Sequence, residues 1–290
     1  VFVAYCITYF AYILMTEGDI TKLNHEMFIF LAINCFMLLF SYLFIYIIEK
    51  VWGFTSNVML VELGDLNSPM LKSLSEKCPG TFQHATQVAN IAAEAANAIG
   101  ANALLVRTGA LYHDIGKIAN PQCFTENQTA GVRYHEDLTP KESAQEIIRH
   151  ISDGLALADK HGLPHVIKDF ISSHHGTSST GYFYTKYLND GGDPDDVAAF
   201  FYDGFKPVTK EQVVLMICDS VEAASRSLKH YSAESISALV DSIVDGKMSQ
   251  GQFSEADISI REINSIKEVI KSYIQQMYHS RVSYPKRRQK

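Results

Sequence analysis

The sequence lacks an excess of basic residues. Its 25 Lys and Arg stand against 32 Asp and Glu, so the net charge is −7 at pH 7. Strong non-specific binding to a nucleic-acid polymer is therefore not expected, because such binding depends on cationic side chains that neutralise phosphates. A protein of this charge that handles a phosphate ester needs a local source of positive charge, and bound metal ions are one such source.

Cysteine is scarce as well. The five cysteines are widely spaced, odd in number and form no CxxC pair; they are Cys6, Cys35, Cys78, Cys123 and Cys218. We therefore expect neither a disulfide framework nor a zinc ribbon, and a reducing compartment fits. Continuous alternating strand patterns are also missing, which favours an all-α fold for the soluble part. Internal repeats and low-complexity tracts are absent as well.

Charge is absent from two stretches near the N-terminus. Residues 28–48 form a run of 21 residues without a charged side chain. At about 1.5 Å per residue, a helix of that length crosses the roughly 30 Å hydrocarbon core of a bilayer. Residues 1–15 are equally free of charge but too short to span. The alternative is a buried helical hairpin in a soluble core.

The chain begins inside an apolar run, and no basic segment of a signal peptide precedes it. We therefore expect residues 1–48 to be the C-terminal part of a larger transmembrane region. Lys50, Lys72 and Lys77 follow the second run and weakly favour a cytoplasmic location for the rest of the chain.

Helical periodicity dominates the remainder, with apolar residues three and four positions apart. We predict a helical connector over 49–79, a helical bundle over 80–280 and a basic tail over 281–290. Thr139 with Glu142 and Thr209 with Gln212 read as capping boxes. The predicted helices cover residues 81–100, 103–116, 139–162, 164–176, 209–229, 232–246 and 259–277.

Seven polar residues fall at the inner faces or ends of five of these helices, where a core has no obvious use for them. They are His84, His113, Asp114, His150, His174, His175 and Asp219. One alone would usually be a hydrogen-bonded core residue. Together, five imidazoles and two carboxylates suit Fe, Mn, Co, Ni or Zn better than Mg or Ca. They exceed the needs of one tetrahedral zinc and suit two ions about 3.5–4 Å apart. Adjacent helical residues diverge by about 100°, so His113 and Asp114 can serve one ion, or Asp114 can bridge two.

The order of these residues resembles the extended metal signature of HD-domain phosphohydrolases. Over residues 58–280 the chain is similar to the membrane-anchored seven-transmembrane HD proteins that cleave cyclic di-AMP. The motifs that carry this resemblance are "LVELGDLNSPML", "PGTFQH", "GALYHDIGK", "FTENQ", "HHGT", "YFY" and "DSVEAASRSL". It implies one metal on His84, His113, Asp114 and Asp219, and a second on Asp114, His150, His174 and His175. The family usually carries iron or manganese.

The resemblance implies a multi-pass cell-membrane protein with a cytoplasmic HD domain that hydrolyses cyclic di-AMP to linear pApA. Its partners would be this substrate and the bilayer, no nucleic-acid polymer is expected, and an oligomer is compatible with the sequence. Hydroxide activated by two metal ions would attack phosphorus, with Asp114 shared between the ions and the ribose 3′ oxygen leaving. Lys117 would add positive charge at the phosphate, or would be an ordinary lysine at a helix C-terminus.

Some stretches depart from the family pattern or leave alternatives open. Residues 176–184 suit either contact with phosphate and adenine or a solvated loop with core aromatics. His135 follows Arg-Tyr where the family shows Asn-Pro, and we expect a surface histidine. Phe201 replaces an expected Arg, which concerns substrate contacts rather than metal ligands.

Two other functions compete with the favoured one. An HD hydrolase of another cyclic dinucleotide or of nucleotides is the first. The cyclic di-GMP class typically shows E-x-x-D-G-x-G-Y-P after the double histidine, where this chain reads "GTSSTGYF". A non-catalytic nucleotide sensor is the second. Loss of one of the seven candidate metal ligands would favour it, and all seven are present in the sequence.

Overall fold

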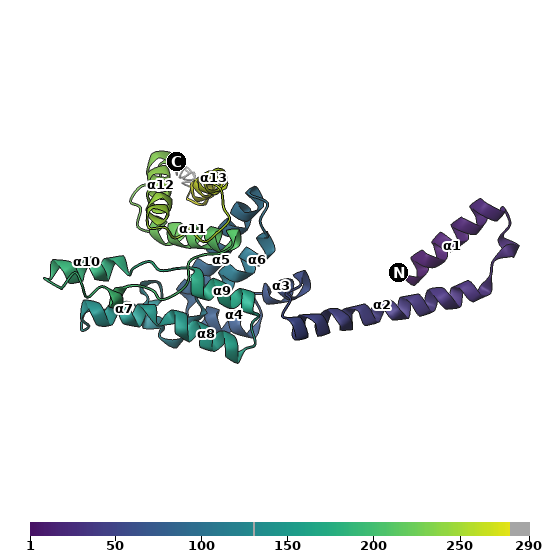
Figure 1. Cartoon of the computed structure of the whole chain (residues 1–290), viewed down its shortest axis with the longest axis horizontal. Helices are drawn as coiled ribbons and strands as arrows, with labels where there is room; N and C mark the ends of the chain where they lie inside the picture. Colours follow the sequence, from purple (N-terminus) through teal and green to yellow (C-terminus); the bar gives the residue numbers. More distant parts are fainter. Residues whose placement is uncertain (130, 279–290) are drawn as a thin grey trace, which may run out of the picture. The chain divides into compact units, whose positions relative to one another are not determined.

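A computed structural model describes residues 1–129 and 131–278 of the chain, so the predicted tail over 281–290 lies outside the described residues. The chain divides into two compact units, Val1–Ser56 and Asn57–Lys290. Within the described ranges the regular structure is helical, apart from an isolated bridge between Ser179 and Phe201 (Figure 1). The prediction of an all-α fold is confirmed for these residues.

The first unit consists of two apolar helices, α1 (Phe2–Glu17) and α2 (His25–Trp52), with a short 3₁₀ turn η1 (Ile20–Lys22) between them. The Asn24 side chain accepts a hydrogen bond from the Glu26 amide and begins α2. Within α2, His25–Glu49 is long and apolar enough to cross a membrane, with a mean hydropathy of 2.4. The shorter α1 does not reach this length.

The second unit is organised around α5 (Pro79–Ala98), which packs against α6 (Ala103–Tyr112), α11 (Lys210–Ser225) and α13 (Ile260–Met277). The buried face of α5 is rich in alanine, including Ala85, Ala92 and Ala95, and such small side chains allow neighbouring helices to approach closely. Within the predicted connector, α3 (Asn57–Leu63) and α4 (Pro69–Lys77) contribute Leu60, Leu71 and Leu74 to the same core.

Several helix ends lie where capping residues in the sequence predict them. Thr139 and Glu142 form a complete capping box, as do Thr209 and Gln212, which confirms both predictions. Gly100 and Gly162 adopt positive φ just after α5 and α8 (His150–Lys160), a conformation that favours glycine and ends a helix.

Two predicted helices are shorter or broken in the structure. The helix predicted over 103–116 ends at Tyr112, and the chain continues through Asp114 into the 3₁₀ turn η2 (Ile115–Ala119). The helix predicted over 139–162 divides at Arg149 into α7 (Pro140–Ile148) and α8 (His150–Lys160). Both changes occur where η2 and the start of α8 lie against each other, a tertiary contact that periodicity within one segment does not report.

The sequence leaves residues 176–184 open between a ligand-contacting stretch and a solvated loop with core aromatics; the structure forms helix α10 (Gly181–Asn189) from Gly181 onward and buries Phe183. The helix packs beside α7, and Phe183 joins Ala144 and Phe200 in a small second core (Figure 1). This burial stabilises a short helix whose sequence alone carries a weak signal. The remaining elements are α9 (His165–Ser173), α12 (Ala233–Ser249), η3 (Pro121–Cys123), η4 (Thr125–Asn127) and η5 (Ala198–Phe200).

Gly116 allows η2 to touch α8. A Cβ atom at Gly116 would lie 1.9 Å from the His150 carbonyl oxygen and 2.5 Å from the Gly154 amide nitrogen. Backbone atoms cannot yield as a flexible side chain can, so Gly116→Ala should lower the free energy of unfolding by about 3 kcal/mol. Denaturant unfolding followed by circular dichroism measures this change. Gly246→Ala is the matched control, because a Cβ there meets no atom within 4 Å. An unchanged unfolding midpoint for Gly116→Ala would contradict the close contact.

Candidate metal centre

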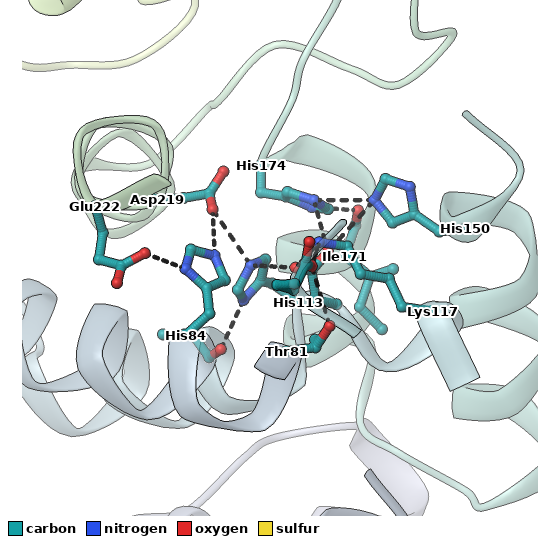
Figure 2. A network of polar contacts seen from close by, with 12 residues as sticks. Thr81, His84, His113, Lys117, His150, Ile171, His174, Asp219 and Glu222 are labelled. Atoms are coloured by element: carbon teal, nitrogen blue, oxygen red, sulfur yellow. Dashed lines mark hydrogen bonds and ion pairs between the residues drawn. The ribbon is translucent and has the colours of Figure 1, made fainter. Parts of the chain in front are cut away.

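Side chains from five helices and their ends converge in the second unit (Figure 2). His84 comes from α5, His113 and Asp114 from the end of α6, and Asp219 from the middle of α11. The start of α8 and the end of α9 supply the others, His150, His174 and His175. All seven are buried except His175, which is partly exposed. The structure thus brings together every residue that the sequence singled out as a metal ligand.

The ligand atoms form two groups. His84, His113 and Asp114 offer atoms that lie within 4.8 Å of one another. Asp219 lies beside this group, with its Oδ1 2.9 Å from His84 Nε2 and 3.5 Å from His113 Nε2. The second group consists of His150, His174 and His175, whose ligand atoms also lie within 4.8 Å of one another.

Asp114 lies between the two groups. Its Oδ2 is 3.2 Å from His113 Nε2 on one side. Its Oδ1 is 3.5 Å from His150 Nε2 and 3.7 Å from His174 Nε2 on the other. Each oxygen of this one carboxylate therefore faces a different set of imidazoles.

Three of the histidines are oriented by their own backbone. Nδ1 of His113 donates to the Ala110 carbonyl at 2.7 Å. Nδ1 of His150 lies 2.6 Å from the Ile147 carbonyl, and Nδ1 of His174 lies 2.9 Å from the Ile171 carbonyl. In each case the partner is three residues earlier, at the helix end. These bonds place the proton on Nδ1 and leave Nε2 as the ligand atom that faces the cluster.

This arrangement fits a divalent cation. His113 Nε2 and Asp114 Oδ1 are buried and have no hydrogen-bond partner among the described residues, a state that usually costs about 1–3 kcal/mol per group. His150 Nε2 lies 3.3 Å from His174 Nε2. Because each ring donates through Nδ1, the two Nε2 lone pairs face each other. A cation bound between the two rings would accept both Nε2 lone pairs and remove this repulsion.

Protonation equilibria support the same conclusion for the second group. Burial lowers the pKa of His174 to about 3 and also lowers the pKa of His150 and His175. These rings are therefore neutral at pH 7, the form that binds metal. Burial opposes the charged form of His113 as well, but the Asp114 carboxylate raises its pKa to about 10, so without metal this ring also carries a proton on Nε2 at pH 7, which a bound cation would displace. Despite burial, Lys117 and His113 hold the pKa of Asp114 well below its usual range.

Glu222 is a site residue that the sequence analysis missed. It is fully buried on α11, where its carboxylate accepts a hydrogen bond from His84 Nδ1 (Figure 2). Arg226 donates to the same carboxylate, with its Nη2 2.8 Å from Oε1. The signal was present in the spacing, because Glu222 and Arg226 follow Asp219 by three and seven positions on one helix face.

Lys117 also lies at this centre. Its Nζ is 2.7 Å from Asp114 Oδ2 and 2.9 Å from Glu126 Oε1, a partner that the sequence analysis did not identify. Lys117, Glu126 and the ligands His84, Asp114 and Asp219 line a pocket of about 530 Å³, called here the metal-centre pocket.

His135 corrects the expectation of a surface histidine. It is half-buried, its Nε2 donates to the Cys123 carbonyl at 2.8 Å, and its ring lies 4.9 Å from that of Phe183.

Known proteins that resemble this chain include one whose HD domain has been solved. Residues 81–224 match the HD domain family. The chain is 41% identical over 237 residues to the cyclic-di-AMP phosphodiesterase PgpH of Listeria monocytogenes serotype 1/2a (strain 10403S), which covers 82% of this chain and 33% of that protein. It is 39% identical over 237 residues to PgpH of Bacillus subtilis (strain 168), again covering 82% of this chain and 33% of the relative. The chain thus spans about a third of the length of these curated relatives.

Solved structures extend the likeness to three dimensions. The crystal structure of the HD domain of the L. monocytogenes phosphodiesterase PgpH matches with a TM-score of 0.69 and 41% identity, covering 73% of this chain and all of that one. The same domain in complex with cyclic-di-AMP matches with a TM-score of 0.70 and 41% identity, covering 73% and 99%.

Proposed function

Because the chain belongs to the HD-domain family, we propose that it is a membrane-anchored phosphodiesterase that opens cyclic di-AMP to linear pApA. The observation that carries this proposal is the buried cluster in which Asp114 lies between two groups of histidines. Relatives at about 40% identity carry the name of this activity, and one of their HD domains has been crystallised with cyclic-di-AMP.

We further propose that the cluster holds two divalent transition-metal ions, iron or manganese. His84, His113, Asp114 and Asp219 would hold one, and Asp114, His150, His174 and His175 the other. Such cations, when bound, would supply a water of lowered pKa and would offset charge on the phosphoryl oxygens. Asp114 would be the residue shared by both sites. The backbone-bonded Nδ1 atoms hold three rings in register before metal arrives, so little ordering accompanies binding.

Lys117 would contribute positive charge at the edge of the metal-centre pocket. Its Nζ is already held beside the Asp114 carboxylate, where a substrate phosphate would approach. Glu126 keeps the lysine oriented and lowers the charge it presents before substrate binds.

The proposed membrane region rests on the N-terminal helices of the chain. The apolar helix α2 supports anchoring by its length and composition. We propose a multi-pass, seven-transmembrane protein of the cell membrane with the HD domain in the cytoplasm.

Glu222→Ala should weaken metal binding at the His84 side of the cluster by roughly 10–100-fold. Loss of the carboxylate that accepts from Nδ1 frees both the tautomer and the orientation of the His84 ring. Calorimetric titration with Mn²⁺ measures the effect, and Glu268→Ala on α13, an exposed glutamate paired with Lys271, is the control. Equal Mn²⁺ affinity in Glu222→Ala and wild type would contradict this role.

A substrate panel tests the proposed function. The full chain in detergent, with added Mn²⁺ or Fe²⁺, is given cyclic di-AMP, cyclic di-GMP, pApA and deoxynucleoside triphosphates. We expect cyclic di-AMP to be converted to pApA in preference to the others. Preference for another substrate would favour the second hydrolase class, and binding without turnover would favour the sensor.

A further inference from the structure

A second pocket opens beside the metal-centre pocket and shares His175 and Ser220 with it. We call it the Lys247 pocket; its volume is about 430 Å³. The stretch that follows the double histidine forms one side and α12 the other. Its polar lining residues include Ser178, Ser179, Ser220, Ser242, Lys247 and Gln250. Tyr202 also lines it and stacks on the His175 ring, with the ring centroids 4.3 Å apart.

Lys247 differs from the cations of the neighbouring pocket in making no direct ion pair with the described residues, although the Asp219 carboxylate acts on it from beyond ion-pair distance. Lys117 and Arg226 are each paired with a carboxylate, at 2.7 Å and 2.8 Å. Lys247 is only partly exposed and makes no ion pair or hydrogen bond with the described residues. Among the described residues, no Asp or Glu side chain lines its pocket. Burial of a cation without a partner is unfavourable, so this pocket is suited to an anionic ligand.

The hydroxyl groups of the pocket add to this preference. The hydroxyls of Ser178 and Ser220 donate to backbone carbonyls, at 2.6 Å and 2.8 Å. Those of Ser179 and Ser242 make no hydrogen bond with other described residues, which leaves their protons free to donate to a ligand. A phosphate accepts hydrogen bonds from hydroxyl and ammonium donors together.

On the basis of the proposed function, we infer that the Lys247 pocket binds the second, uncleaved phosphate of the cyclic dinucleotide. The two phosphates belong to one ring, so the second must lie one nucleoside unit from the phosphate at the metal centre. The Lys247 pocket is adjacent to that centre through His175 and Ser220.

The pocket on the other side of the metal centre suits a phosphate less well. It has a volume of about 630 Å³ and shares Thr125 and Glu126 with the metal-centre pocket. Its lining mixes several aromatic rings with side chains of both charges, the carboxylates being Glu126 and Glu136 and the cations Arg133 and Lys186. Arg133 is paired there with Glu136. Lys186 makes no ion pair with the described residues either, but it is exposed and shares its pocket with two carboxylates. On the Lys247 side the lysine is partly buried, and the nearby carboxylate that acts on it is Asp219, one of the residues proposed to hold metal.

The test compares two substrates that differ in their number of phosphates. The wild-type chain and its Lys247→Gln variant are assayed with Mn²⁺ on cyclic di-AMP and on bis(p-nitrophenyl) phosphate, which has a single phosphodiester. Loss of a charge-assisted hydrogen bond should raise KM for cyclic di-AMP about tenfold or more. The ratio of kcat/KM for cyclic di-AMP to that for the model diester should fall by the same factor. Lys247→Arg should restore most of the ratio, and Lys160→Gln, at an exposed position on α8, is the matched control.

The outcomes separate the inference from the function on which it rests. An active wild type with an unchanged KM for cyclic di-AMP in Lys247→Gln would overturn the inference alone. Equal loss on both substrates would also overturn it, because that pattern reports general damage to the centre. A wild type that cleaves the model diester but not cyclic di-AMP would overturn the proposed function together with the inference.

Discussion

Asp114→Ala is expected to abolish cleavage of cyclic di-AMP while leaving the helix content of the protein intact. Asp114 is the residue whose two oxygens face the two histidine groups, at 3.2 Å and 3.5 Å from the nearest ring nitrogens of each. Its removal takes a ligand from both proposed metal positions at once. We expect turnover below about a thousandth of the wild-type rate, the upper range for loss of one electrostatic group at a reacting centre.

The measurement is turnover with excess Mn²⁺, accompanied by far-ultraviolet circular dichroism of the same samples. Asp159→Ala is the control, since that carboxylate is exposed and pairs with Lys168 on the surface. Turnover that survives in Asp114→Ala, with the control unaffected, would show that Asp114 is not shared between the proposed ions.

Removal of metal should have an equally large effect. Dialysis against a chelator is expected to eliminate hydrolysis and to lower the thermal unfolding midpoint, because a ligand that binds only the folded state stabilises it by about 2.7 kcal/mol at a hundredfold excess over Kd. Metal-free protein would keep His113 Nε2 and Asp114 Oδ1 buried without hydrogen-bond partners. Addition of Mn²⁺ or Fe²⁺ should restore both properties, and Ca²⁺ should not, because imidazole is a poor ligand for it. A chelated, folded and fully active preparation would contradict the metal-dependent mechanism.

Much of the site was accessible from sequence because its members are chemically conspicuous. Histidines and carboxylates on apolar helix faces need a partner, and seven of them in order predict a shared one. The helix starts at Thr139 and Thr209 were equally predictable, since capping is a local interaction.

The remaining features depend on contacts between distant segments. The division at Arg149 occurs where Gly116 meets the backbone of α8, and α10 forms where Phe183 finds an apolar site. In the sequence, Glu222 is an ordinary helical glutamate. Only the packing of α11 against α5 brings the Glu222 carboxylate to His84. The position of Lys247 is equally hidden in the sequence, because whether a lysine makes an ion pair with the described residues depends on segments far away along the chain.

The requirement for two metal ions is tested most directly by titrating the metal-stripped chain with Mn²⁺. The number of bound ions and the rate of pApA formation are measured on the same samples. Asp114 facing two histidine groups predicts that the rate rises with occupancy and saturates when two ions are bound per chain. Full activity with a single bound ion, or with none, would contradict a two-metal phosphodiesterase.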